Sequence, residues 1–135
     1  MAPTVLWLSG VPGDGKTCCS QKLAGDRPVF STDHFVLRVE EWCEDLDMLQ
    51  QWKIFGPRKI GHFLDWAVLA GKTEYVAFKL LSHFVPNDGV SIIEGYMPLS
   101  IQEKVMSVLE SRGVFVWLGM RFHRYQRLIG KKDWR

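Results

Sequence analysis

Hydrophobic and polar positions along the chain predict short strands that alternate with helices. Apolar runs of strand length occur at 4–9, 27–31, 90–94 and 114–118. Elsewhere apolar residues recur at helical spacing, and glycine or proline ends most of these stretches. The predicted helices cover 16–25, 35–53, the stretch after Gly56-Pro57 to about 70, 73–84, 98–112 and 120–132.

This order of elements predicts an α/β fold. Strands that are apolar throughout are typical of a parallel sheet covered by helices on both faces. The length of 135 residues suits a single domain, 1–135. Such sheets bind ligands at the carboxyl ends of their strands, so the residues that follow each strand are the candidates for function.

The first predicted strand is followed by a glycine-rich segment at 10–17. It reads GVPGDGKT and fills every position of the phosphate-loop pattern G-x-x-x-x-G-K-[ST]. Glycines let the backbone curl so that its N–H groups point at phosphates, Lys16 adds a positive charge, and the Thr17 hydroxyl can bind Mg²⁺. We therefore predict a site for ATP and Mg²⁺. The residues predicted to bind the nucleotide here are Gly10, Gly13, Asp14, Gly15, Lys16, Thr17 and Cys18.

Two acidic residues follow later strands. Asp33 stands in the segment STDHF at 31–35, and Glu94 ends the apolar run 90–94. Phosphoryl transfer to an alcohol needs a carboxylate that takes the hydroxyl proton, which fits Asp33, and an acid near Mg²⁺, which fits Glu94. The alternative for Asp33 is a helix N-cap before Phe35. Glu94 is harder to explain structurally, because burying an acid is costly unless it meets a partner.

Charge is distributed unevenly, although the net charge is only +2. Five acids and no base occur from 40 to 47, whereas bases dominate from 112 onward. This pattern suggests a charged cleft or lid, with solvated helix faces as the alternative. In the predicted helix 120–132, Arg121 and Arg124 are placed to stabilise the migrating phosphoryl group, and Arg127 to bind the nucleotide.

The composition is that of a globular protein, with 47% hydrophobic and 24% charged residues. No apolar run is long enough to span a membrane, and no secretory signal is expected. Cys18, Cys19 and Cys43 lack metal-ligand spacing and predict free thiols in a reducing cytoplasm.

Tryptophan is abundant, with six residues in the chain. Trp7 and Trp117 fall inside predicted strands and are expected in the core. Trp42 and Trp52 fall on the middle helices, where core packing is the simpler expectation and an aromatic wall for a base or sugar is the alternative.

Taken together, the segments 10–17, 31–35 and 92–95 resemble the phosphate-loop kinases. The similarity is closest to the uridine kinase, pantothenate kinase, zeta-toxin-like and polynucleotide kinase branches. In these families an S/T-x-D-x-F segment after the second strand provides the catalytic Asp, and a strand ending in Glu-Gly provides the second acid. The resemblance implies a three-layer P-loop NTPase fold whose parallel sheet of about four strands has the order 2-3-1-4, followed by an arginine-bearing lid.

The resemblance also implies a function, namely an ATP-dependent kinase that transfers the γ-phosphoryl group to a hydroxyl of a nucleoside, nucleotide or nucleic-acid end. The stretch 35–85, which matches no motif, is expected to be a helical insertion that recognises the acceptor, and the basic helix 120–132 takes the place of the lid. The fifth strand of these kinases has no counterpart in residues 1–135, so how the base is held stays open. The alternatives are a nucleotide-binding module and an NTP hydrolase without an alcohol acceptor.

Overall fold

The computed structural model of the chain describes residues 3–8 and 29–119. The described chain divides into two compact units. The sheet unit contains 3–8, 29–31, 86–96 and 109–119, and the helical unit contains 32–85 and 97–108. Each unit is described by itself below.

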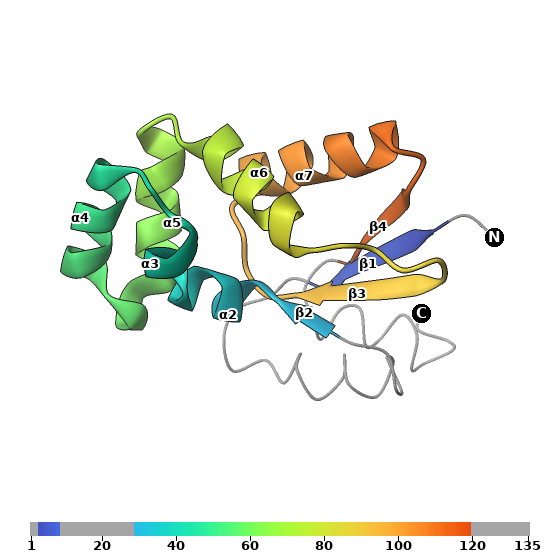
Figure 1. Cartoon of the computed structure of the whole chain (residues 1–135), viewed down its shortest axis with the longest axis horizontal. Coiled ribbons are helices and arrows are strands. Elements are labelled where there is room, and N and C mark those ends of the chain that lie inside the picture. The colour runs from blue at the N-terminus through green and yellow to red at the C-terminus, as the bar shows by residue number, and fades with distance from the viewer. Residues whose placement is uncertain (1–2, 9–28, 120–135) are drawn as a thin grey trace, which may run out of the picture. The chain divides into compact units, whose positions relative to one another are not determined.

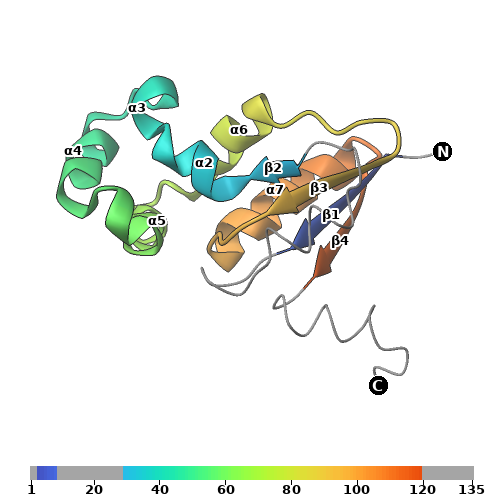
Figure 2. The ribbon, with the colours of Figure 1, turned by 90° about the horizontal axis from the view of Figure 1, so that it is seen from below.

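The sheet unit is built on four parallel strands, as the sequence predicts. They are β1 (Thr4–Leu8), β2 (Val29–Ser31), β3 (Val90–Glu94) and β4 (Phe115–Gly119). Their order is β2-β3-β1-β4, which is the predicted order 2-3-1-4 (Figures 1 and 2). Both pairings of β1 are in parallel register over its whole length, so β1 is a central strand.

Burial along the strands follows their place in the sheet. In β1 the residues Val5 to Leu8 are all buried, which explains why its sequence is apolar without alternation. Trp7 is 0% exposed, which confirms its expected core position. Trp117 is 47% exposed, so the expectation that it lies in the core is wrong. The reason is that β4 is an edge strand in which Val116 is buried while the alternate residues face outward.

The helical unit consists of short helices joined by tight connections (Figure 1). None of the helices within 29–119 has the length and apolar character that crossing a bilayer requires. The elements are α2 (Thr32–Leu37), α3 (Val39–Trp42), α4 (Leu46–Phe55), the 3-10 helix η1 (Pro57–Lys59), α5 (Ile60–Leu69), α6 (Thr73–His83) and most of α7 (Leu99–Ser111).

Aromatic side chains form much of the core of the helical unit. Phe35 and Trp42 stack with ring centroids 4.5 Å apart, and the Trp42 indole N–H donates to the Phe35 carbonyl at 2.7 Å. Trp52 packs edge-on against the fully buried Phe63, with centroids 5.1 Å apart. Trp42 and Trp52 are therefore core residues, which confirms the simpler of the two expectations. The apolar surface that these two side chains bury stabilises the unit.

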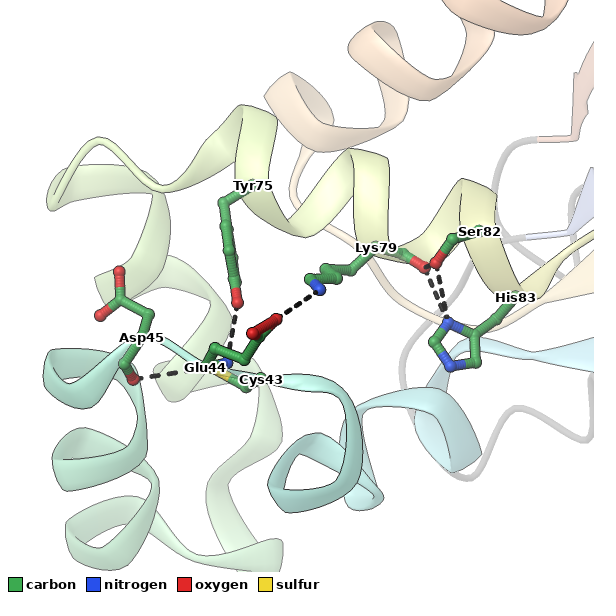
Figure 3. Close-up of polar contacts among 7 residues, drawn as sticks. All are labelled: Cys43, Glu44, Asp45, Tyr75, Lys79, Ser82 and His83. Atoms are coloured by element: carbon green, nitrogen blue, oxygen red, sulfur yellow. Dashed lines mark hydrogen bonds and ion pairs between the residues drawn. The ribbon is translucent and has the colours of Figure 1, made fainter.

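The single helix predicted over 35–53 is wrong, because the structure breaks it into α2, α3 and α4. Cys43 and Asp45 adopt extended backbone between α3 and α4. Contacts from α6 hold this break (Figure 3). The Glu44 backbone N–H donates to the Tyr75 hydroxyl at 2.8 Å, and Lys79 reaches the Glu44 carboxylate at 3.3 Å. The Tyr75 hydroxyl thus gives a partner to a backbone N–H at the break, and the Lys79–Glu44 pair joins the break to α6.

Asp45 has two structural roles at this break. Its carboxylate accepts from the Met48 backbone N–H at 3.0 Å, which caps α4, and from the Lys72 ammonium at 2.6 Å. The hydrogen bond from Lys72, followed by that from Met48, lowers the pKa of the Asp45 carboxyl. The same contact raises the pKa of Lys72. The pair joins the start of α4 to the residue before α6.

We expect Asp45→Asn to remove a pH-dependent part of the stability. Asn keeps the cap but cannot ionise. The folded pKa of Asp45 lies below the unfolded value of about 3.9, so its contribution is complete above that value and is lost as the pH falls through the folded pKa. Urea unfolding of both proteins between about pH 6 and about pH 2 measures this: the wild-type advantage should be constant above about pH 5 and should shrink as the pH falls below about 4.

The matched variant Asp45→Ala removes the cap as well and should cost about 1 kcal/mol more than Asp45→Asn throughout the range. A wild-type advantage over Asp45→Asn that stayed constant with pH would contradict the assigned ion pair.

Candidate functional site

The carboxyl ends of the strands meet where the sequence places its candidate residues. Leu8, the last residue of β1, is in register with Glu94, the last residue of β3. On its other side, Glu94 is in register with Ser31, the last residue of β2. The glycine-rich segment 10–17 begins two residues after Leu8. The strand that leads to the phosphate-loop motif therefore ends beside an acid.

Glu94 is buried, with 6% of its surface exposed. Among the described residues, no other aspartate, glutamate, lysine or arginine is buried to this degree. A carboxylate in such a position is costly unless charge or hydrogen bonds compensate for lost water. Glu94 therefore lies at a buried strand end, in register with the last residues of β1 and β2.

Gly95 fastens the end of β3 to β1. Its N–H donates to the Leu8 carbonyl at 2.9 Å, and its own carbonyl accepts from the Trp7 indole at 3.4 Å. Its φ is +127°, a conformation that L side chains rarely adopt. The backbone geometry thus explains the glycine at position 95. In the sequence this glycine is notable only as part of the Glu-Gly strand ending seen in phosphate-loop kinases. A glycine directly after a buried strand also indicates an unusual backbone conformation or a close approach of another backbone.

Asp33 is the second residue of α2 and is partly exposed. The helix begins at Thr32, which is buried, so Asp33 lies in the first turn and is not the N-cap before Phe35 that the sequence left as an alternative. Asp33 follows Ser31 by two residues, and Ser31 is the register partner of Glu94. Asp33 belongs to the helical unit and Glu94 to the sheet unit.

Several predicted residues lie outside the part of the chain that the structure describes. The predicted helices 16–25 and 120–132 lie there too. Their roles stay predictions from the sequence. The site residues concerned are Gly10, Gly13, Asp14, Gly15, Lys16, Thr17, Cys18, Arg121, Arg124 and Arg127.

Three acids of the segment 40–47 form ion pairs within the helical unit. Glu41 pairs with Arg38, Glu44 with Lys79 and Asp45 with Lys72. Cys43 in the same segment is a buried free thiol. Over 3–8 and 29–119, no group of three or more His, Cys, Asp or Glu side chains is arranged to hold a metal ion.

No family model, no curated protein and no solved structure matches this chain significantly.

Replacing Gly95 with alanine should destabilise the sheet unit by about 1–3 kcal/mol, because the side chain forces a strained backbone at its positive φ. The control is Gly89→Ala, since an added Cβ there meets nothing within 4 Å and its φ lies outside the positive range. Urea unfolding measures both variants. Equal effects of the two substitutions would overturn the role assigned to Gly95.

Proposed function

We propose that this chain is an ATP-dependent kinase of the P-loop NTPase fold that transfers the γ-phosphoryl group to a hydroxyl acceptor. One observation carries the proposal. The phosphate-loop motif 10–17 follows Leu8, and the in-register neighbour of Leu8 on the next strand is the buried acid Glu94. The parallel order β2-β3-β1-β4 supports it, because such sheets bind ligands at the carboxyl ends of their strands.

Magnesium fits the donors that these segments offer. Carboxylate and hydroxyl oxygens are the hard ligands that Mg²⁺ takes, and Glu94 and Thr17 are such donors. Bound there, Mg²⁺ would neutralise charge on the nucleotide phosphates. The burial of Glu94 keeps its carboxylate away from bulk water, which strengthens its interaction with a cation.

Asp33 is the proposed general base. In this role its carboxylate accepts the proton of the acceptor hydroxyl while the acceptor oxygen attacks the γ-phosphorus. The bond between the γ-phosphorus and the β–γ bridging oxygen breaks, and ADP leaves. The partial exposure of Asp33 in the first turn of α2 leaves the carboxylate accessible to a substrate. Lys16, Arg121 and Arg124 are proposed to stabilise the migrating phosphoryl group, and Arg127 to bind the nucleotide. A nucleoside, nucleotide or nucleic-acid end is the proposed acceptor class.

Lys16→Ala should weaken ATP binding and lower turnover by about a hundredfold or more, because it removes the positive charge that faces the phosphates. Isothermal titration with ATP and Mg²⁺ measures binding, and ADP release measures turnover. Lys79→Ala is the control, because it also removes a lysine but one that pairs with Glu44. Unchanged ATP affinity in Lys16→Ala would exclude the phosphate-loop assignment.

Asp33→Asn should lower acceptor-dependent ADP release by about 10²- to 10⁴-fold and leave ATP binding intact, since only proton transfer is lost. Asp47→Asn is a matched control, because Asp47 also lies in the first turn of a helix. The assay supplies pooled nucleosides, nucleotides and 5′-hydroxyl oligonucleotides. Release that needs no acceptor would show a hydrolase, and ATP binding without release would show a nucleotide-binding module.

A further inference from the structure

Lysines and arginines of the helical unit fall into two groups. Outside 53–59, every one of them pairs with a carboxylate. These structural pairs are Arg38–Glu41 at 2.9 Å, Lys72–Asp45 at 2.6 Å, Lys79–Glu44 at 3.3 Å and Lys104–Glu74 at 3.4 Å. These four paired cations join segments of the unit or, in the case of Arg38, support one turn.

The second group is Lys53, Arg58 and Lys59, which we name the basic corner. All three are exposed, and no carboxylate of the described chain lies within ion-pair distance of them. The sequence contains no Asp or Glu from 48 to 64. The cations of the basic corner therefore lack the ion-pair stabilisation that the other cations of the unit have.

The backbone of the basic corner is well defined. Gly56 ends α4 with a φ of +64°, and its N–H donates to the Trp52 carbonyl at 2.7 Å. Pro57 then begins η1, which contacts both α4 and α5. The two helices lie side by side (Figure 1). The cations therefore extend from the end of α4 and from the short connection that joins it to α5. Because hydrogen bonds and helix contacts fix the backbone there, ligand binding costs less backbone conformational entropy.

Aromatic rings lie in the same connection. The rings of Phe55 and His62 are nearly parallel, with an interplanar angle of 20° and centroids 6.4 Å apart. Phe55 is half-buried and His62 is exposed, so each keeps part of its surface accessible. Cations that bind phosphates, together with rings that stack on bases, are the two components of surfaces that bind single-stranded nucleic acid.

We infer that the basic corner binds the sugar–phosphate backbone of a single-stranded nucleic acid, with a base stacked beside Phe55 and His62. An anionic membrane is less well matched, because lipid-binding clusters use about four to eight cations and need no stacked rings. The inference does not rest on the proposed kinase activity, since it uses no residue of the phosphate-loop motif or of its acids.

The test uses the triple variant Lys53→Gln, Arg58→Gln, Lys59→Gln and fluorescein-labelled oligomers of about 15 thymidines or uridines, which separate DNA from RNA. Fluorescence anisotropy over a salt series gives affinity and its salt dependence. Each phosphate contact contributes a slope of about 0.7, so the variant should lose about two in slope and bind about a hundredfold more weakly near 0.1 M salt.

The matched control is Arg38→Gln, Lys79→Gln, Lys104→Gln, which removes the same charge and the same residue types from paired positions. It should change affinity for the oligomers by less than about threefold. Equal losses in both triple variants would mean a general charge effect and would overturn the inference. Absence of binding by the wild-type protein would overturn it as well.

Two further measurements separate base stacking from charge, and nucleic acid from a membrane. Phe55→Leu should weaken oligomer binding about fivefold with an unchanged salt slope, because only stacking is lost.

Vesicles containing phosphatidylserine test whether the basic corner binds an anionic membrane instead. Loss of vesicle binding with unchanged oligomer binding in the basic-corner variant would refute the inference. The basic-corner variant should keep its affinity for ATP, so failure of the kinase proposal and failure of this one are distinguishable.

Discussion

The in-register pairing of β1 with β3 is the constraint on which the candidate site depends. It brings Leu8 beside Glu94 at the same edge of the sheet, directly before the motif 10–17. A slip of one residue would turn Glu94 to the opposite face of the strand. The hydrogen bond from the Gly95 N–H to the Leu8 carbonyl fastens this register at its end.

The two units are stabilised by different interactions. The sheet unit depends on apolar strands, with Leu6, Leu8 and Ile92 in one buried cluster. The helical unit combines stacked aromatic rings with ion pairs. In it α6 and the residue before it organise the break between α3 and α4 through Lys72, Tyr75 and Lys79. The partly buried Lys72–Asp45 pair resists screening by salt better than the more exposed Lys79–Glu44 pair. The acidic segment 40–47 thus serves the architecture of the unit.

Much of the sheet was predictable because its strands are recognisable from local sequence. The apolar runs ending at Leu8 and Glu94 and the glycine turns around them are short-range signals. The interruption of the predicted helix 35–53 was not predictable. Its causes are partners 27 to 35 residues away, which no local periodicity records. Trp117 was misplaced for a similar reason, because its apolar neighbours suit any strand and only the strand order puts it at an edge.

The sequence by itself determined the phosphate-loop motif, the two candidate acids and the alternation of strands and helices. These features are local, since spacing and side-chain chemistry define them. Tertiary structure decided that Glu94 is buried beside the end of β1 and that Asp33 lies within the first turn of α2. It also decided which cations have acidic partners. Such facts depend on contacts between distant segments, and only folding brings those segments together.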